Sequence, residues 1–357
     1  MKIAIDNRAI AHSGIGVYSR ILLKQLPKNG REVSVVAYGD DIAVNRNGFW
    51  NKYVNGIKRV LRDQITMSGW LQANNVDVYH NPRNTGTPLS CKSKIVTTIH
   101  DIIPHIYPQY YLNSPVERAY YELMLRLAIK RSDAIITISE FSKQELLRCY
   151  DVGKKPIYVI PQGCNEEYHQ DDSAEKQIRD KYAIRRPYIL TMGGSEYRKN
   201  VKTVLEAYCG KFDASYDLIV IGGAWRGRDL AKEYADNKEI KFLTGISDED
   251  LLALYNGAAA FVFASFYEGF GIPLLEAMHC GTPVIAAKAS CLPEIAGDGA
   301  EYFSALDVQD LRRALEHVLS NADYAAELVQ RGFDRAKLYS WEKTVAMTYE
   351  VYKKVLG

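Results

Sequence analysis

The stretch AFVFASFYEGFGIPLLE, residues 260–276, joins a short apolar run to a glycine-containing turn and then to a helical pattern. Ala260–Ala264 has the aromatic and apolar composition of a buried strand. Glu268–Gly271 is the predicted turn, and Pro273 suits the first position of a helix because an N–H there would have no partner within the helix. A strand that passes through a turn into a helix is the repeating unit of a parallel sheet covered by helices.

The same alternation of strand and helix continues on both sides of this stretch. Helical patterns include Val116–Lys130 and a segment that starts at Ser142, where Ser142 and Glu145 have capping-box spacing. Polar residues without a long strand occupy 166–186. Before and after that gap, strands are predicted at 2–5, 32–38, 77–80, 94–100, 134–139, 157–160, 188–192, 217–223, 240–243, 260–264 and 283–287.

We therefore predict an α/β protein with two doubly wound, Rossmann-like domains, joined near residues 165–185. The domains are expected at 1–165 and 166–340. The helix at 341–357 has apolar residues at a spacing of three to four and is expected to pack back on the first domain. Open parallel sheets bind ligands at the carboxyl ends of their strands, so two such sheets facing each other would place a ligand in the cleft between them.

Composition excludes several classes of protein. The 357 residues are 47% hydrophobic and 25% charged, as in a soluble globular protein. A net charge of +2 gives no reason to expect nucleic acid as a partner. The six cysteines contain no C-x-x-C pair, which argues against a zinc site and for a reducing compartment. Asp6 interrupts the first apolar run, so we expect no signal peptide and a cytoplasmic protein.

Two glutamates flank the glycine turn. Gly269 and Gly271 let the backbone approach a ligand closely, and the free amides of a helix start favour an anion or a sugar oxygen. Glu268 is expected at the strand tip and Glu276 in the first turn of the helix. Each carboxylate accepts two hydroxyl hydrogen bonds, which suits the vicinal diols of a hexose or a ribose. The alternative is that both are acidic residues at the positive end of a helix dipole.

A second loop carries cations. In GGSEYRKN (193–200), Arg198 and Lys199 follow the first predicted strand of the second half and precede a helix. A diphosphate needs cations and backbone amides at such a place, so we interpret the pair as a phosphate site. The alternative is two solvated surface charges.

Three further motifs are weaker. HSGIGVYSR (12–20) places Gly14 and Gly16 at a helix start, which is a phosphate loop or only a tight turn. SDED (247–250) contains a formal D-x-D metal motif but has capping-box spacing, so we predict a helix start and no metal. GGAWRG (222–227) follows a strand but lacks the G-x-G-x-x-G of a dinucleotide site.

The string EGFGIPLLEAMHCGTPVIAAKASCLPEIAGDGA (268–300) resembles the signature of glycosyltransferase family 4, whose members are retaining enzymes with the two-domain GT-B fold. The resemblance covers nearly the whole chain. It includes, in the family's order, IDNRAI, GIGVYSR, TTIHDIIP, ITISEFSK, VIPQG, GGSEYRKN and LLALYNGAAAFVFASFYEGFG.

The resemblance implies a role for each matching residue of the second domain. Glu268 would hydrogen-bond the donor hexose, and Glu276 would bind the ribose hydroxyls. The backbone at 269–272 would line the sugar and its phosphate, through Gly269, Phe270, Gly271 and Ile272. Leu243–Ile246 would contact the nucleotide base, with Ile246 at its end.

Further implied roles concern the phosphates. Arg198 and Lys199 would neutralise the diphosphate and make it a better leaving group without a metal or other cofactor. Gly194, in the same loop, stands close to where many relatives carry an additional arginine, so the two cations should be sensitive to substitution. Gly14 and Gly16 would close on the phosphates from the first domain.

The first domain also supplies a histidine. His100, in TIHDIIP, matches a histidine of the family's donor-sugar site, although a lone histidine is more often a satisfied residue at a strand end. Asp101 is expected to start a helix or to take part in catalysis. The family's mechanism is drawn as transfer on one face of the sugar, with the departing diphosphate helping to take the acceptor proton.

The segment FWNKYVNGIKRVLR (49–62) mixes aromatic, aliphatic and basic residues as an interfacial amphipathic helix does. It is expected either to touch the inner face of the cytoplasmic membrane or to pack on its own domain.

The resemblance implies a retaining glycosyltransferase that adds one sugar to a lipid-linked oligosaccharide in the synthesis of a bacterial surface polysaccharide. The opening IDNR, GIGVYSR and TIHDIIP most resemble members that use GDP-mannose, so we expect mannosyl transfer. The alternatives are dTDP-rhamnose, GDP-fucose and UDP-glucose or UDP-N-acetylglucosamine as donor, a nucleotide-sugar epimerase, and a non-catalytic sugar-binding scaffold.

Overall fold

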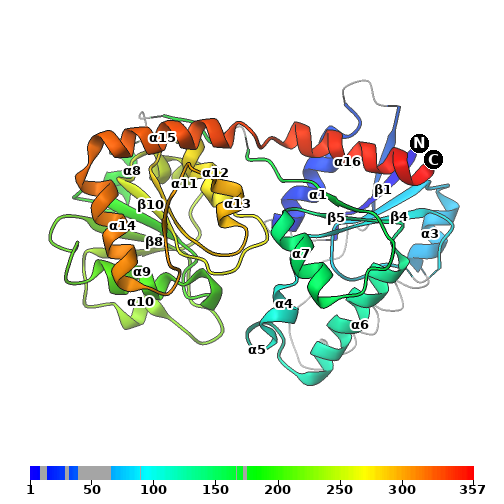
Figure 1. Cartoon of the computed structure of the whole chain (residues 1–357), viewed down its shortest axis with the longest axis horizontal. Helices are drawn as coiled ribbons and strands as arrows, with labels where there is room; N and C mark the ends of the chain where they lie inside the picture. Colours follow the sequence, from blue (N-terminus) through cyan, green and yellow to red (C-terminus); the bar gives the residue numbers. More distant parts are fainter. Residues whose placement is uncertain (9–13, 29–31, 39–65, 89, 166, 172–174) are drawn as a thin grey trace. The chain divides into compact units, whose positions relative to one another are not determined.

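The computed structural model describes residues 1–8, 14–28, 32–38, 66–88, 90–165, 167–171 and 175–357. The chain divides into two compact units (Figure 1). Unit 1 contains Met1–Gln162 together with Trp341–Gly357, and unit 2 contains Gly163–Ser340. The amphipathic segment predicted at 49–62 lies outside the described residues.

Unit 1 is built on a parallel sheet with the strand order β2-β1-β3-β4-β5-β6. From β1 the chain goes first to β2 on one side and then to β3 on the other, so the strand order reverses at β1 and β3. The strands are β1 (Lys2–Asp6), β2 (Ser34–Tyr38), β3 (Val78–Asn81), β4 (Lys94–Ile99), β5 (Ala134–Thr137) and β6 (Ile157–Val159).

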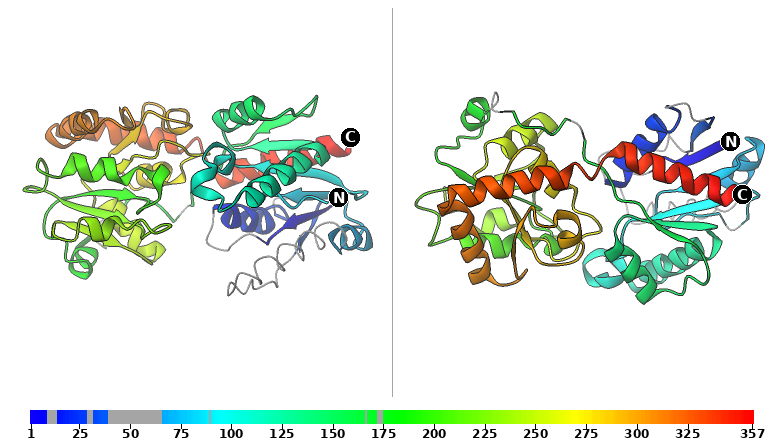
Figure 2. Two further views of the ribbon diagram at one scale, coloured as in Figure 1. Left: turned by 90° about the horizontal axis from the view of Figure 1, so that it is seen from below. Right: turned by 45° about the horizontal axis from the view of Figure 1, so that its top comes forward.

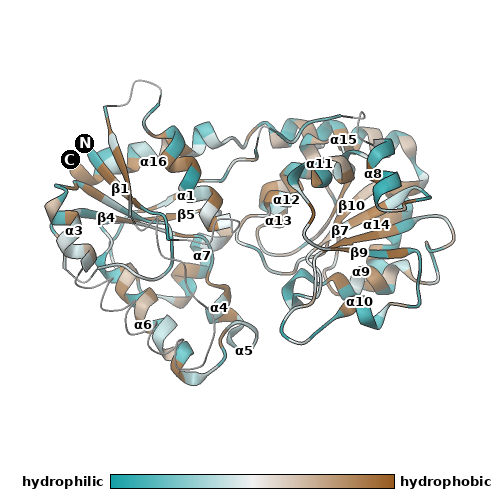
Figure 3. Ribbon diagram, turned by 180° about the vertical axis from the view of Figure 1, so that it is seen from behind, coloured by the Kyte–Doolittle hydropathy of each residue, from teal (hydrophilic) through white to brown (hydrophobic). Residues whose placement is uncertain are grey.

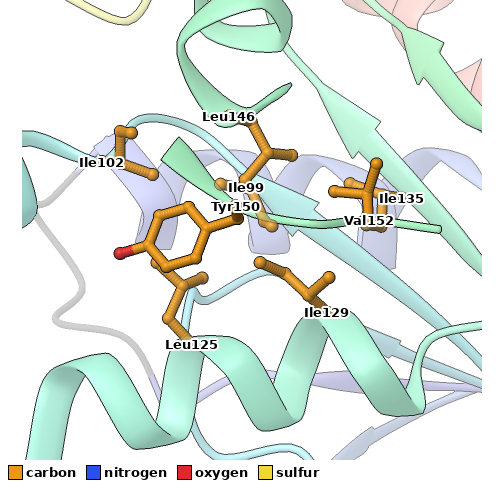
Figure 4. Close-up of a cluster of buried hydrophobic side chains, with 8 residues drawn as sticks. All are labelled: Ile99, Ile102, Leu125, Ile129, Ile135, Leu146, Tyr150 and Val152. Carbon is orange, nitrogen blue, oxygen red and sulfur yellow. The ribbon is translucent and has the colours of Figure 1, made fainter. Parts of the chain in front are cut away.

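Helices cover both faces of this sheet (Figures 1 and 2). Ile99 and Ile135 pack with Leu125 and Ile129 of α6 and with Leu146 of α7 in the cluster shown in Figure 4. The other face carries α1 and α16, which run side by side. The helices of unit 1 are α1 (Gly14–Gln25), α3 (Met67–Ala73), α4 (Ile103–Ile106), α5 (Pro108–Tyr111), α6 (Pro115–Arg131), α7 (Glu140–Cys149) and α16 (Trp341–Leu356).

The start of α7 corrects one prediction. We expected a helix from Ser142 with Ser142 as its cap, but α7 begins at Glu140 and its cap is Ser139, whose hydroxyl accepts from the Ser142 N–H at 3.0 Å. The Ser142 hydroxyl instead donates to the His100 carbonyl at 2.9 Å. Both serines had suitable chemistry, and the extended backbone of Ser139 decides which one caps the helix.

Unit 2 is built on a second parallel sheet with the order β12-β11-β10-β7-β8-β9. The strand order reverses at β7 and β10. The three-residue edge strand β12 was not predicted, because EYF is too short to show a strand pattern. The strands are β7 (Tyr188–Met192), β8 (Asp217–Ile221), β9 (Ile240–Leu243), β10 (Ala260–Phe263), β11 (Val284–Ala287) and β12 (Glu301–Phe303).

Helices also lie on both faces of the second sheet, and the strands between them are the most apolar part of the unit (Figure 3). On one face α9 packs against α14, and on the other α12 packs against α15. The helices are α8 (Glu175–Lys181), a 3₁₀ turn (Tyr197–Lys199), α9 (Val201–Tyr208), α10 (Leu230–Glu233), α11 (Asp248–Asn256), α12 (Ile272–His279), α13 (Leu292–Ala296), α14 (Val308–Ser320) and α15 (Ala322–Ala336).

Two helix starts in unit 2 bear on the predicted site. Ser247 caps α11 by accepting from the Asp250 N–H at 3.1 Å, which confirms that SDED is a helix start. Helix α12 begins at Ile272, so Pro273 is its second residue and Glu276 its fifth. The prediction that Glu276 lies in the first turn is therefore wrong, and attraction to the helix dipole is not a sufficient reason for its presence, since that effect falls off within the first turn.

The C-terminal helix belongs to unit 1. Helix α16 buries Trp341, Val345, Val351 and Tyr352, and the Tyr352 hydroxyl lies 2.5 Å from Nδ1 of His80 in β3. Within the described part of the chain, no helix combines the length and the apolar character that crossing a membrane requires.

Candidate functional site

The predicted residues of unit 2 collect where the strand order of its sheet reverses. β7 and β10 are neighbours, but the chain leaves β7 toward β8 and leaves β10 toward β11 on the opposite side. The loops that follow these two strands therefore diverge at the carboxyl edge of the sheet, which is the usual place for a ligand in an open parallel sheet. Arg198 and Lys199 follow β7, and Glu268 follows β10.

Glu268 binds both cations directly. Its Oε2 lies 2.6 Å from Nη1 of Arg198, and its Oε1 lies 2.7 Å from Nζ of Lys199. Glu268 is only 8% exposed, and burial by itself would raise the pKa of its carboxyl. The charges of Lys199 and Arg198, with the hydrogen bond from Lys199, outweigh burial and lower that pKa to about 2. The carboxylate is thus ionised at any physiological pH.

Acidic groups balance the charges of the two cations. Arg198 also pairs through Nε with Oε1 of Glu196 at 2.8 Å, so two carboxylates face two cations. A diphosphate that bound here would exchange places with at least one carboxylate. The arrangement rules out the alternative that Arg198 and Lys199 are two solvated surface charges, since both side chains are only 15% exposed.

Hydrogen bonds to backbone groups hold these loops in position. The Ser290 hydroxyl, in the loop after β11, accepts from the Glu268 N–H at 3.1 Å. The Arg198 carbonyl accepts from the Phe266 N–H at 3.0 Å. Asn200, in the left-handed conformation with φ 54°, donates from its side chain to the Ala264 carbonyl at 3.2 Å. The loops after β7, β10 and β11 therefore form one connected unit around Glu268.

Gly194 allows two loops to touch. A Cβ on this residue would lie 2.5 Å from the Gly223 carbonyl oxygen, and its φ of +53° disfavours other residues as well. The Ser195 N–H donates to the same carbonyl at 2.9 Å. The glycines of GGAWRG thus serve to pack the loop after β8 against the loop that carries the cations.

The glycine turn before α12 contains two glycines and one buried aromatic side chain. Gly271 is the N-cap of α12 with φ +103°. The Phe270 ring is buried and meets the Tyr339 ring edge to face, with centroids 5.6 Å apart. Gly269 and Gly271 are buried, and Ile272 is half-buried at the first position of the helix. The Phe270 side chain is thus part of the core, and the Phe270 carbonyl accepts from the Cys291 thiol at 3.0 Å.

Glu276 has a different environment from Glu268. The Tyr255 hydroxyl donates to its Oε2 at 3.0 Å. Burial raises the pKa of Glu276 to about 7; the Tyr255 hydrogen bond lowers it, and nearby Asp248 adds to the rise. One carboxylate of the pair is therefore locked in its ionised form and the other titrates near neutrality. Ile246, at the end of the predicted base segment, is half-buried just before the cap of α11.

The remaining predicted residues lie in unit 1. His100 directly follows β4 and is 6% exposed, and burial lowers the pKa of its imidazole to about 4. The Asp101 carboxylate accepts from the Ile103 N–H at 3.0 Å, which gives it a structural role at the start of α4. Gly14 and Gly16 lie in the first turn of α1, where Gly16 is buried and a Cβ on Gly14 would meet open space.

Comparison with known proteins identifies the family. The model described as Glycosyl transferases group 1 matches residues 174–335, and the model described as Glycosyltransferase Family 4 matches residues 12–168. The O-antigen chain mannosyltransferase B of Escherichia coli is 32% identical over 287 residues, which cover 77% of this chain and 74% of that protein. The chain belongs to glycosyltransferase family 4.

Two further relatives define the extent of the similarity. The serotype-specific mannosyltransferase WbdA of Escherichia coli is 33% identical over 276 residues, 74% of this chain and 34% of WbdA, so the chain spans about a third of that relative. HepE from Anabaena, solved in complex with UDP-glucose, superposes with a TM-score of 0.74 at 16% identity and covers 99% of this chain and 100% of HepE. The likeness confirms the predicted α/β, GT-B fold of this family 4 member.

Sequence reasoning missed a second charged cluster, at the strand reversal of unit 1. The buried Asp6 ends β1, and its Oδ2 lies 2.5 Å from Nη2 of Arg8 and 2.8 Å from Nη2 of Arg83. Although burial opposes ionisation, the two guanidinium groups hold the pKa of Asp6 well below its usual range. The available signal was Asp6 itself, a charged residue at the end of an apolar strand, which we had used only to exclude a signal peptide.

Metal ligands do not gather in the part of this family 4 chain that the structure describes. There, no group of three or more His, Cys, Asp or Glu side chains is placed to hold an ion.

Proposed function

We propose that the protein is a retaining hexosyltransferase that moves mannose from GDP-mannose to a lipid-linked oligosaccharide during the synthesis of a bacterial surface polysaccharide. The observation that carries the proposal is the buried Glu268, held at the strand reversal of unit 2 by Arg198 and Lys199 in a chain about a third identical to two mannosyltransferases of Escherichia coli. The names of those relatives support mannose as the transferred sugar, and the name of one supports O-antigen as the polysaccharide.

The site suggests how its charges would be used. A bound diphosphate would take over Arg198 and Lys199, and the cations would stabilise the negative charge that develops as the sugar departs. Glu268 would then be released to accept hydrogen bonds from sugar hydroxyls. Glu276 would hold the ribose, and the backbone of residues 269–272 would line the sugar and its phosphate. This division of roles needs neither a metal nor a cofactor.

The donor is tested by ligand-induced stabilisation. A ligand at 100 times its dissociation constant adds roughly 2.7 kcal/mol to the free energy of unfolding. We expect GDP to raise the midpoint of thermal unfolding, and UDP and dTDP to raise it much less. A selective shift with UDP or dTDP would overturn GDP-mannose in favour of a glucosyl or rhamnosyl donor. If no nucleotide shifted the midpoint, the proposal that unit 2 holds a nucleotide-sugar site would be wrong.

The reaction is tested by product analysis. Incubation with GDP-mannose and a lipid-linked acceptor should release GDP and yield an α-linked product, since the sugar in GDP-mannose is itself α-linked. A β-linked product would overturn retention. Conversion of the nucleotide sugar without transfer would favour an epimerase, and binding without turnover would favour a sugar-binding scaffold.

The proposed setting is the cytoplasm, with peripheral contact to the inner face of the membrane through residues 49–62. Basic and apolar side chains in that segment, together with a lipid-linked acceptor, support this contact. Co-sedimentation with liposomes of anionic lipid at low salt is the expected result. If the protein failed to co-sediment, the proposed membrane contact would be wrong, but the proposed transferase activity would be unaffected.

A further inference from the structure

The imidazole of His100 is held on several sides. His100 directly follows β4 and its carbonyl accepts from the Ser142 hydroxyl at 2.9 Å. Its ring meets the Tyr18 ring edge to face, with centroids 5.1 Å apart and planes at 90°. The ring is thus fixed in a buried position at the carboxyl edge of the sheet of unit 1.

One ring nitrogen faces an amide nitrogen, which can donate a hydrogen bond but cannot accept one. Nε2 of Gln162 lies 3.2 Å from Nδ1 of His100, and Gln162 is 4% exposed. An amide nitrogen has no free lone pair to accept with, so Nδ1 must be the acceptor. Because burial lowers the pKa of this histidine to about 4, the ring is neutral at physiological pH and carries one proton. That proton is therefore on Nε2.

The other ring nitrogen of His100, Nε2, is buried and, within the described part of the chain, lacks a hydrogen-bond partner of normal geometry. The Pro82 carbonyl is close enough to the ring to offset part of the lowering of its pKa. His80, one strand away in β3, differs: its Nδ1 lies 2.5 Å from the Tyr352 hydroxyl and its Nε2 lies 2.8 Å from the Thr98 hydroxyl. Buried polar groups without partners are uncommon and often mark functional sites.

We propose that Gln162 fixes His100 in the Nε2–H tautomer, so that His100 presents a neutral hydrogen-bond donor to an oxygen of the bound nucleotide sugar and does not act as a general base. Gln162 is then a positioning residue that acts through His100. The tautomer is a property of the free protein. The use of its N–H rests on the proposed function.

The tautomer is measured by NMR on protein labelled with ¹⁵N at histidine. Two-bond ¹H–¹⁵N spectra separate a protonated ring nitrogen from an unprotonated one, and His100→Gln assigns the signals. At pH 7 we expect a protonated Nε2 and an unprotonated Nδ1 at His100. A protonated Nδ1 in the wild-type protein would overturn the proposal, whatever reaction the protein catalyses.

Variants test the part played by Gln162. In Gln162→Glu the new carboxylate can only accept, so Nδ1 of His100 should become protonated, and Gln144→Glu on the exposed side of α7 is the charge control that should leave His100 unchanged. Gln162→Met, which has no donor, should give a mixture of tautomers and raise the Kd for GDP-mannose about threefold to tenfold. An unchanged Nδ1 signal in Gln162→Glu would overturn the role of Gln162.

Ligand titration identifies the oxygen that is bound. If the Nε2–H signal shifts with GDP, a phosphate oxygen is the acceptor; if it shifts only with GDP-mannose, a sugar hydroxyl is the acceptor. Both outcomes support the proposal. If neither ligand moves the signal although GDP raises the unfolding midpoint, the nucleotide site stands and the donor role of His100 is overturned.

Discussion

Nζ of Lys199 lies 2.7 Å from Oε1 of Glu268, so the residue expected to bind the sugar pairs with a residue expected to bind the diphosphate. The two side chains come from the loops after β7 and β10, which diverge at the strand reversal of unit 2. If a nucleotide sugar binds as proposed, its diphosphate takes the place of Glu268 beside the cations, so substitutions on the two sides of this pair should have different effects.

Glu268→Gln should abolish sugar transfer while leaving the Kd for GDP within about threefold of the wild-type value. The amide keeps the size of the side chain but loses the charge, so Arg198 and Lys199 lose a competitor for phosphate. Turnover and calorimetric titration with GDP measure the two effects. Glu206→Gln, at an exposed acid on α9, is the control. A parallel loss of turnover and GDP binding would instead assign Glu268 to folding or to nucleotide binding.

Lys199→Met should weaken binding of GDP about tenfold or more and binding of GMP less than about threefold, because charge-assisted hydrogen bonds contribute roughly 1.5–3 kcal/mol and only GDP has a second phosphate. Lys202→Met is the matched control on the same segment, since Lys202 is exposed and pairs with Glu206. Equal losses for GDP and GMP would mean that Lys199 does not recognise the diphosphate.

The fold was predictable because the strands of both sheets are nearly continuous apolar runs, which a parallel sheet covered on both faces requires. YILTM and IKFL coincide with β7 and β9. The predicted strand 32–38 begins only at Ser34, since propensity does not reveal where pairing with β1 starts. β12 was missed because three residues at a sheet edge carry too little pattern.

Candidate residues in local motifs could be named from the sequence, whereas contacts between distant residues could not. Glu268, Arg198 and Lys199 were candidates because each stands beside a glycine turn or a helix start, and the structure brings their side chains together. The contact of Gln162 with His100 joins residues 62 positions apart, and nothing in either neighbourhood indicates it. The position of Glu276 in the helix was off by one residue, which moves it out of the first turn, because α12 begins at Ile272 and not at Pro273.

Glu276 should make both stability and nucleotide binding depend on pH. Its pKa is about 7 in the folded protein and roughly 4.3 when unfolded, so the folded state binds the proton more tightly. Its contribution to the free energy of unfolding is therefore full below about pH 4.3 and falls as the pH rises toward 7. In Glu276→Gln, the free energy of unfolding should no longer show this decrease. Urea unfolding measured from pH 5 to 8 tests the prediction.

The same group should affect GDP binding with the opposite sign. Ribose hydroxyls donate to an ionised carboxylate, so binding favours the deprotonated form and the Kd for GDP should decrease between pH 6 and 8, with release of a proton. In Glu276→Gln this dependence should vanish. Calorimetry in two buffers of different ionisation enthalpy measures the proton release. If the Kd of the wild-type protein for GDP did not vary between pH 6 and 8, the proposal that Glu276 binds the ribose would be wrong.

Gly194→Ala should destabilise unit 2 and reduce GDP binding, because the added Cβ would meet the backbone of Gly222 and Gly223 at 2.5–2.7 Å and rigid backbone cannot move aside as a flexible side chain can. Gly210→Ala is the matched control: its φ of +70° imposes similar left-handed strain, but a Cβ there has nothing within 4 Å. The control should cost about 1 kcal/mol in the free energy of unfolding. Gly194→Ala should cost at least about 2 kcal/mol more, as overpacking commonly does. Equal costs would show that the loops after β7 and β8 separate freely, and the cation loop would then not depend on their contact for its position.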